Sequence, residues 1–224
     1  MEASFDRLSA RIRPIANLLR GEYGLSRLGN PHDPVDDIVY LCLSRMTQQT
    51  KYQAAYTAVR AAMPTWDQVA DAAPADLATI IHFAGLAPTK AKQIGAMLRE
   101  IRSREGCIDL TRLHELTDSE TEQYLTSLPG VSRKTALCVM MYTLHRQVLP
   151  VDTHVWRVAR RIQHSEARSW SENGGKLLEN SVPPELRMDV HVNFIVHGRS
   201  VCRARRPRCN SCVLTQLCDH KLHA

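Results

Sequence analysis

Aromatic residues are scarce in this sequence of 224 residues and make up 5% of it. We therefore expect no broad sheet on which unpaired bases stack against aromatic side chains. The chain has 10 glycines and 11 prolines, too few for a collagen-like or low-complexity protein. No apolar run approaches the roughly 18–20 residues of a membrane-spanning helix. The first 21 residues mix charged and apolar side chains, so we expect no secretory signal.

Acidic residues are outnumbered by basic ones, 23 to 29, which gives a formal net charge of +6. This balance favours a polyanionic partner. The seven cysteines are an odd number and are unevenly placed. Cys42, Cys107 and Cys138 are scattered, whereas four lie in the last 23 residues. A secreted disulfide framework would spread an even set along the chain, so the tail predicts a metal site in a reducing, cytoplasmic compartment.

Apolar residues recur at helical spacing almost everywhere, and no segment has the alternation of a strand. The first helix should place one apolar face inward, formed by Phe5, Leu8, Ile12, Ile15, Leu18 and Leu19. Further helices are expected at about 34–48, 52–63, 91–101, 118–125 and 133–145, from 152 onward, and from 183 to 202. With a normal content of hydrophobic residues, 44%, the chain is predicted to be an all-α protein of one or two domains.

The segment from Leu128 to Ala136 predicts two helices joined by a tight turn. Pro129 ends the first helix, Gly130 allows a positive φ or a close approach, and Ser132 is a suitable N-cap for the second. Free N–H groups at Gly130, Val131 and Ser132 could bind a DNA phosphate without reading sequence. Taken alone, such a turn is usually an ordinary helix connection.

Lys134 follows in the first turn of the second helix, where the positive end of the helix and partial burial favour the neutral amine. A neutral lysine amine can attack a sugar carbon and form a Schiff base. Asp152, 18 residues later, is placed to cap another helix or to serve as a carboxylate that stabilises positive charge or accepts a proton. The simpler alternatives are a surface lysine and an N-cap.

The tail cysteines follow the spacing Cys-x6-Cys-x2-Cys-x5-Cys, at Cys202, Cys209, Cys212 and Cys218. Four thiolates at this density could hold a zinc ion or a [4Fe–4S] cluster, and spacing alone does not distinguish them. The loop between the first two carries a run of arginines, namely Arg203, Arg205, Arg206 and Arg208. If metal ligands hold both ends of this loop, its cations would be fixed in place for phosphates.

The hairpin with Lys134, the Val151–His154 segment and the four-cysteine tail, in this order, resemble the endonuclease III family of helix-hairpin-helix DNA glycosylases. The resemblance extends from about Val35 to His220. It implies two all-α domains, a six-helix domain of residues 36–149 and a cluster domain of residues 1–35 with 150–224. It also implies a [4Fe–4S] cluster on the four tail cysteines, a monomer, and a partner that is double-stranded DNA with a damaged base or abasic site.

By this resemblance, Lys134 attacks C1′ and displaces an oxidised pyrimidine, Asp152 assists, and β-elimination nicks the strand. Gln48 would fill the gap left by the flipped base, and Leu86 would enter the base stack beside it; the ordinary alternatives are a helix-end Gln and a core Leu. Three further segments depart from the family pattern and bear on which base is removed, namely Arg45-Met46-Thr47, Lys51 and Ala87-Pro88.

Several alternatives remain open from the sequence. An adenine-mispair glycosylase is disfavoured because that family usually lacks the lysine and carries a glutamate where Ser44 aligns here. A thymine or modified-cytosine glycosylase on the same scaffold would differ only in pocket residues. A non-catalytic module that binds damaged DNA would not need both Lys134 and Asp152, and a zinc-stabilised DNA-binding domain would be colourless.

Overall fold

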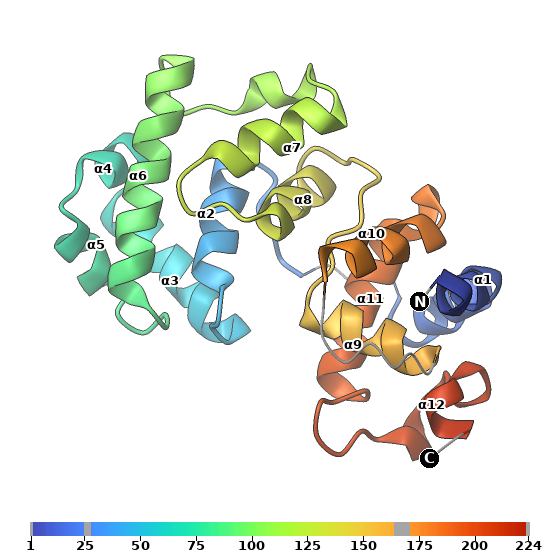
Figure 1. Ribbon diagram of the computed structural model, residues 1–224. Helices are drawn as coiled ribbons and strands as arrows, with labels where there is room; N and C mark the ends of the chain where they lie inside the picture. Colours follow the sequence, from blue (N-terminus) through green and yellow to red (C-terminus); the bar gives the residue numbers. More distant parts are fainter. Residues whose placement is uncertain (1, 25–27, 164–170, 223–224) are drawn as a thin grey trace. The chain divides into compact units, whose positions relative to one another are not determined.

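The computed structural model describes residues 2–24, 28–163 and 171–222. Within these ranges the secondary structure is helical and contains no strand, which confirms the predicted all-α class (Figure 1). The chain divides into two compact units, residues 30–146 and residues 1–29 with 147–224. The predicted division into a helix-hairpin-helix domain and a cluster domain stays a prediction. In the described part of the chain, no helix is both long and apolar enough to cross a membrane.

The unit of residues 30–146 is built around α2, which packs against α3, α6 and α8 (Figure 1). Asp33 caps α2 by accepting hydrogen bonds from the backbone N–H groups of Val35 and Asp36, at 2.8 and 3.0 Å. Nearly every α2 residue is buried, so this helix forms the centre of the unit. Its helices are α2 (Pro34–Ser44), α3 (Gln49–Ala62), α4 (Trp66–Asp71), α5 (Pro74–Ile80), α6 (Ala87–Glu105), α7 (Asp118–Ser127) and α8 (Arg133–Tyr142), with a 3-10 turn at Thr111–His114.

The predicted extension of the second helix to residue 48 is wrong. Helix α2 ends at Ser44, and Met46 has a left-handed backbone with φ of 51° that an α-helix does not allow. Gln48 instead stands at the N-cap position of α3, without a side-chain capping bond. The segment 45–48 is therefore a loop between two helices.

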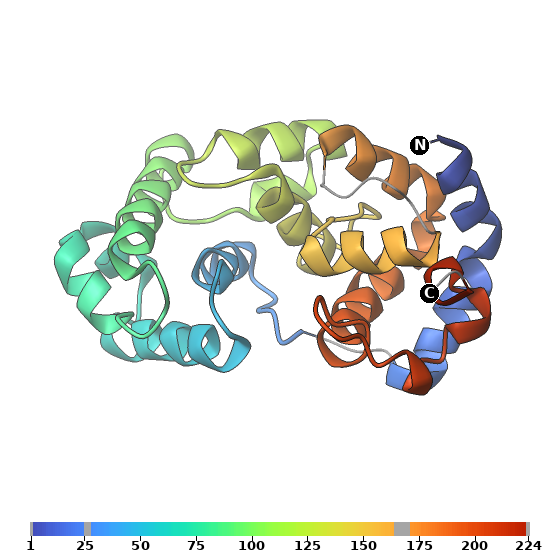
Figure 2. The same ribbon diagram turned by 60° about the horizontal axis from the view of Figure 1, so that its bottom comes forward.

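The other unit contains α1 (Glu2–Tyr23), α9 (Thr153–Ile162), α10 (Glu172–Ser181), α11 (Arg187–Ser200) and α12 (Asp219–Leu222). Short 3-10 turns lie at Pro184–Leu186, Cys209–Ser211 and Thr215–Leu217. Helix α11 packs against α9 and α1, and α10 packs against α1 (Figures 1 and 2). The hydrophobic core of the unit fills the space between these helices.

Four of the predicted inward residues of α1, namely Leu8, Ile12, Ile15 and Leu19, are fully buried in this core. Leu18 was expected on the same face but is 43% exposed, because one residue of rotation carries it past the edge of the apolar stripe. The side chain of Phe5 lies outside the described residues.

Candidate active site and cysteine pocket

The turn between α7 and α8 has the geometry that its sequence predicts. Gly130 has φ of 77°, and a Cβ atom there would lie 3.0 Å from the side chain of Gln93. Both the left-handed backbone and this close approach require glycine. Leu128 and Val131 bury their side chains on either side of it, and the N–H of Val131 donates to the carbonyl of Leu128 at 3.2 Å. The turn is therefore rigid, and Gly130 lies partly exposed at its tip.

Ser132 caps α8, as predicted, because its Oγ accepts a hydrogen bond from the backbone N–H of Thr135. Lys134 is half-buried in the first turn of this helix. The N-terminal end of α8, where the helix dipole is positive, lies beside it. Arg133, which precedes Lys134, forms an ion pair with Glu122, with 2.7 Å between Nε and Oε1. Its guanidinium is therefore held by this carboxylate on α7.

Arg45 connects the loop after α2 to this turn. Its Nη1 donates to the carbonyl of Gly130 at 3.1 Å, and its Nη2 donates to Oε1 of Gln93. Because Gln93 also contacts Gly130, one arginine and one glutamine fix the loop, helix α6 and the hairpin relative to one another. Gln48 lies at the end of the loop that Arg45 begins, just before α3. Leu86 lies in a different loop, immediately before α6. The side chains of both residues are exposed.

Asp37, on α2, is a charged group near Lys134 that sequence reasoning missed. Its side chain is fully buried, and its Oδ1 accepts a hydrogen bond from Nδ2 of Asn30 at 2.6 Å. Burial raises the pKa of this carboxyl to about 7, whereas the Asn30 hydrogen bond and the positive charge of Lys134 oppose the rise. The Asp37 carboxyl thus interacts electrostatically with the lysine of the same unit.

Asp152, in the other unit, is the N-cap of α9. Its Oδ1 accepts hydrogen bonds from the backbone N–H groups of His154 and Val155, both at 2.8 Å. These donors and the helix dipole stabilise the ionised carboxylate and hold its orientation. Burial lowers the pKa of His154, and the nearby Arg157 and Arg199 lower it further against the opposing charge of Asp152. His154 is therefore a neutral neighbour of the carboxylate at neutral pH.

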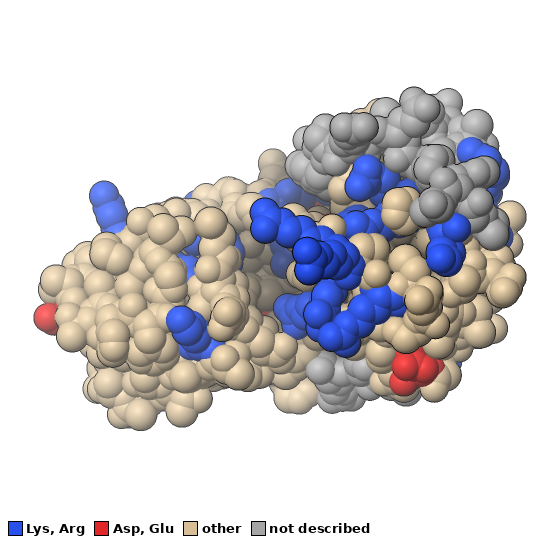
Figure 3. Space-filling model, turned by 90° about the horizontal axis from the view of Figure 1, so that it is seen from below, with Lys and Arg blue, Asp and Glu red and all other residues tan. Residues whose placement is uncertain are grey.

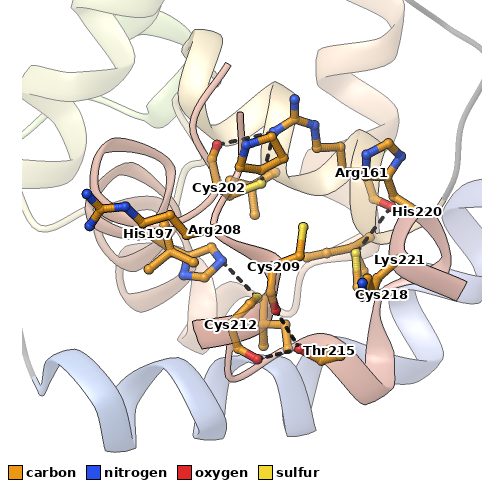
Figure 4. Close-up of a pocket in the computed structure, with 15 residues that line it drawn as sticks. Arg161, His197, Cys202, Arg208, Cys209, Cys212, Thr215, Cys218, His220 and Lys221 are labelled. Carbon is orange, nitrogen blue, oxygen red and sulfur yellow. Dashed lines mark hydrogen bonds between the residues drawn. The ribbon is translucent and has the colours of Figure 1, made fainter. Parts of the chain in front are cut away.

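All four tail cysteines line one pocket (Figure 4). Apolar side chains of Val158, Ile162 and Leu214 form much of its wall. Burial, together with the repulsion that the three other thiols would exert on a thiolate, raises the pKa of Cys212 to about 11, although a backbone hydrogen bond at Leu214 opposes the rise. The pocket is thus lined by Cys202, Cys209, Cys212 and Cys218. Their role as metal ligands stays a prediction.

Cysteine thiolates are ligands of both zinc ions and [4Fe–4S] clusters. Among the described residues, no three His, Cys, Asp or Glu side chains are grouped closely enough to hold a single ion. All four tail cysteines line one pocket, and their donor chemistry fits a metal group that takes four sulfur ligands.

Two basic or polar side chains also contact the sulfurs. Nη1 of Arg161 lies 3.4 Å from Sγ of Cys202, and Nε2 of His197 lies 3.5 Å from Sγ of Cys212 (Figure 4). The other ring nitrogen of His197 is paired with the hydroxyl of Tyr23 at 2.9 Å. Such donors stabilise thiolate sulfur, with or without a metal. Arg11 of α1 forms a bidentate ion pair with Asp219 of α12, at 2.7 and 2.9 Å, and so connects the C-terminal segment to α1.

The loop between Cys202 and Cys209 is held by its backbone. The Val201 carbonyl accepts hydrogen bonds from the N–H groups of Arg203 and Arg208, both at 2.9 Å, and Arg161 donates to the carbonyls of Arg203 and Ala204 at 2.7 and 3.0 Å. The arginine side chains of this loop, at positions 203, 205, 206 and 208, are exposed. Lys and Arg side chains gather over the segment that follows α11, with few acidic ones among them (Figure 3). This surface can attract phosphates.

The chain matches the family model described as HhH-GPD superfamily base excision DNA repair protein, over residues 43–184. Endonuclease III of Escherichia coli strain K12 is 39% identical over 115 residues, which are 51% of this chain and 54% of that protein. Endonuclease III of Haemophilus influenzae is also 39% identical over the same shares of the two chains. The matched segment spans about half the length of these curated relatives.

Solved structures extend the likeness to nearly the whole fold. A structure of a non-covalent endonuclease III–DNA complex matches with a TM-score of 0.84 at 23% identity and covers 96% of this chain and 97% of that one. A thermostable thymine-DNA glycosylase matches with a TM-score of 0.81 at 19% identity and covers 95% and 97%. The resemblance to endonuclease III is confirmed, and the chain belongs to the HhH-GPD superfamily of base excision DNA repair proteins.

Proposed function

We propose that this chain is a bifunctional DNA glycosylase and abasic-site lyase that removes oxidised pyrimidines from double-stranded DNA and acts as a monomer. The observation that carries the proposal is a lysine in the first turn of a helix that opens on a rigid, left-handed glycine turn. The turn can hold a DNA phosphate at its N–H groups while the lysine reaches the sugar. The family to which the chain belongs supports this assignment.

Lys134 is the proposed nucleophile. Its neutral amine forms a bond to C1′ as the glycosidic bond breaks, and the base leaves with the bonding electrons and a proton. The adduct opens to a Schiff base, loses a C2′ proton and expels the 3′ phosphate by breaking the C3′–O bond. The strand is therefore nicked on the 3′ side of the lesion. Gly130, Val131 and Ser132 would bind the phosphate backbone while this occurs.

Asp152 is the proposed charge stabiliser and proton acceptor. Its carboxylate can stabilise the positive charge that develops on the sugar and accept the proton that Lys134 loses. The two backbone donors at 2.8 Å occupy Oδ1, which orients the carboxylate without neutralising it. Asp152 belongs to the unit of residues 1–29 with 147–224, and Lys134 belongs to the unit of residues 30–146.

A [4Fe–4S] cluster on Cys202, Cys209, Cys212 and Cys218 is the proposed cofactor. Its chemistry would be electron transfer, and no bond-breaking step of the proposed reaction passes through it. Its structural effect would be to fix both ends of the loop that carries Arg203, Arg205 and Arg206. These exposed arginines would then contact phosphates of the duplex.

Borohydride trapping on a duplex with a single abasic site tests the proposal. Borohydride reduces a Schiff base to a stable amine, so the lysine becomes covalently attached to the DNA. The wild type should give a trapped adduct and a nicked strand, and Lys134→Gln should give neither. Lys92→Ala, which alters an exposed lysine on α6, serves as the matched control and should trap like the wild type.

The outcome separates the proposed activity from its alternatives. If the folded, iron-loaded wild type gave no adduct but released bases from damaged DNA, the enzyme would be a glycosylase that uses water. If it gave neither product, it would be a binding module. Release of thymine from a mismatch, but not of oxidised pyrimidines, would replace the proposed substrate and keep the mechanism.

A further inference from the structure

The turn at Gly130, which is proposed to bind phosphate, is restrained by side chains from outside the hairpin. Glycine loses more conformational freedom than any other residue when it is fixed in one conformation. A turn with a glycine at its tip is therefore rigid only where its surroundings hold it. A turn that already has its bound conformation binds a ligand more tightly than one that must first be ordered. The groups that hold Gly130 thus bear directly on DNA binding.

The peptide group between Gly130 and Val131 is hydrogen-bonded at both ends. Its N–H, which belongs to Val131, donates to the carbonyl of Leu128 at 3.2 Å and closes the turn. Its carbonyl, which belongs to Gly130, accepts a hydrogen bond from Nη1 of Arg45 at 3.1 Å. This second bond attaches the turn to a residue 85 positions earlier in the chain. The peptide group cannot rotate without breaking one of the two bonds.

The side chain of Gln93, on α6, packs against the same glycine. A Cβ atom at Gly130 would lie 3.0 Å from Cδ of Gln93 and 3.1 Å from its Cβ and Cγ. Oε1 of Gln93 accepts a hydrogen bond from Nη2 of Arg45. Because arginine only donates, the amide oxygen of Gln93 must face it. One planar guanidinium therefore orients both the Gly130 carbonyl and the glutamine that packs on this residue.

The loop that carries Arg45 is itself anchored to α6. Lys90 is almost completely buried, and its Nζ donates to the carbonyl of Leu43 at 2.7 Å and to Oγ1 of Thr47 at 2.6 Å. The Thr47 hydroxyl in turn donates to the carbonyl of Arg45 at 3.1 Å. Lys90 and Gln93 belong to the same helix. The backbone of Arg45 is thus held on α6, while its guanidinium reaches the hairpin.

We infer that Arg45 and Gln93 form a clamp that holds the Gly130 turn in its phosphate-binding conformation before DNA binds. This inference rests on the proposed function, in which the turn binds a DNA phosphate. Arg45 is a positioning residue here, because Nη1 and Nη2 are bonded to the hairpin and to α6 and act on the phosphate through the turn. Arg45 belongs to a segment that departs from the family pattern, so the resemblance does not imply the clamp.

Hydrogen–deuterium exchange of the DNA-free, iron-loaded protein tests the clamp directly. Arg45→Met keeps a long apolar side chain but removes the donors. Backbone amides of residues 128–132 should exchange about tenfold faster in this variant, because the turn opens more often, whereas those of α5 should be unchanged. Arg99→Met is the matched control, since Nη1 of Arg99 donates to the carbonyl of Ala70 at 2.6 Å elsewhere in the same unit. It should leave exchange in the turn unchanged.

Single-turnover borohydride trapping on an abasic duplex measures the consequence for DNA. A phosphate contact made before and during the reaction contributes to binding, so its loss raises the enzyme concentration that gives the half-maximal rate and leaves the maximal rate nearly unchanged. Arg45→Met should raise this concentration about fivefold or more, and Arg99→Met should not. Titration of active enzyme with excess abasic duplex corrects for any fraction that fails to fold, so a loss of folded protein alone would not produce this result.

Two further variants show what the clamp depends on. Arg45→Lys keeps the positive charge but loses the planar pair of donors, so it should weaken binding nearly as much as Arg45→Met does. Gln93→Leu should weaken binding less than Arg45→Met, and adding it to Arg45→Met should have no further effect, because the two residues act as a unit.

Three results would overturn the clamp. The first is unchanged exchange of the turn in Arg45→Met. The second is wild-type binding by Arg45→Lys, or a salt-dependence slope that falls by about 1 in Arg45→Met, since Arg45 would then contact a phosphate itself. The third is a further loss when Gln93→Leu is added to Arg45→Met. If the wild type trapped no abasic DNA, the proposed function would fail, and the exchange experiment would still decide whether the turn is clamped.

Discussion

The buried carboxyl of Asp37 predicts how the free energy of unfolding changes with pH. The carboxyl is fully buried on α2, where Asn30 donates to one oxygen and the other is among the buried oxygens that have no hydrogen-bond partner. Burial raises its pKa from 3.8 to about 7, in opposition to the Asn30 hydrogen bond and the charge of Lys134. A buried carboxylate with one partner costs stability whenever it is ionised.

The sign follows from proton linkage. The folded state binds the Asp37 proton more tightly than the unfolded state does, so the group favours folding most below pH 3.8 and loses that contribution as the pH rises toward 7. A pKa difference of about 3 units corresponds to about 4 kcal/mol in total, at 1.36 kcal/mol per unit. Between pH 5 and pH 8, about 2–3 kcal/mol of this loss should occur.

Asp37→Asn removes the ionisation while keeping the carbonyl oxygen that accepts from Asn30. The variant should therefore gain stability over the wild type on going from pH 5 to pH 8, by about 2–3 kcal/mol in the free energy of unfolding. Urea unfolding of the iron-loaded proteins at the two pH values measures this directly. Asp76→Asn, which changes an exposed carboxyl on α5, should show no comparable pH-dependent gain.

Interaction with Lys134 supplies a second readout. Because the interaction is mutual, ionised Asp37 stabilises the ammonium form of Lys134 by the same energy with which Lys134 stabilises the carboxylate. Asp37→Asn should shift the pH profile of borohydride trapping to lower pH. If the stabilities of Asp37→Asn and wild type ran parallel from pH 5 to pH 8, the account of a buried, weakly compensated carboxyl would be refuted.

Three further predictions concern the other unit. Asp152→Asn should keep the fold, because asparagine also caps helices, but slow base release by about 10²-fold or more, as measured in single-turnover assays. Cys212→Ser should lower the iron content and the visible absorbance of the purified protein and reduce its yield of folded material. Replacement of both Arg205 and Arg206 with alanine should weaken binding to all duplexes alike and reduce the magnitude of the salt-dependence slope by about 2. A change in sequence preference would contradict that role.

The features that sequence predicted best depend on local chemistry. Ser132 and Asp152 each have a short side chain that can accept a hydrogen bond from a backbone N–H two or three residues later, and both do so. Gly130 precedes a helix start and has the positive φ that its position predicts. The grouping of the four tail cysteines was also predictable, because the spacing leaves little chain between them.

Asp37 and Lys90 were missed because nothing local marks a charged residue for burial. Each belongs to a helix whose surface is covered by other helices, so tertiary packing decides the burial. One signal was present for Lys90: it lies on the same helical face as Ile94, Met97 and Ile101, which are all buried. A lysine on a consistently apolar face is evidence for a buried amine with carbonyl or hydroxyl partners.

The loop at Met46 could not be predicted from the sequence for a different reason. The sequence from Pro34 to Gln48 has enough helical periodicity to predict one continuous helix, yet the chain leaves the helix after Ser44. The reversal depends on Lys90, more than 40 residues away, whose Nζ bonds hold the carbonyl of Leu43 and the hydroxyl of Thr47. Local propensity gives no indication of such a long-range hydrogen bond. The strained loop is therefore visible only in three dimensions, and strain of this kind is concentrated at functional sites.

Helix α9 links the proposed catalytic carboxylate to the cysteine pocket within one unit. It begins at the Asp152 cap, and one turn later Arg157 donates to the carbonyls of Cys202 and Gly198 at 3.0 and 2.8 Å. A further turn along, Arg161 holds the backbone of the arginine loop. A rigid helix of ten residues thus fixes the Asp152 carboxylate, the backbone of Cys202 and the arginine loop relative to one another. The cysteine pocket can therefore affect catalysis through position alone, without taking part in bond cleavage.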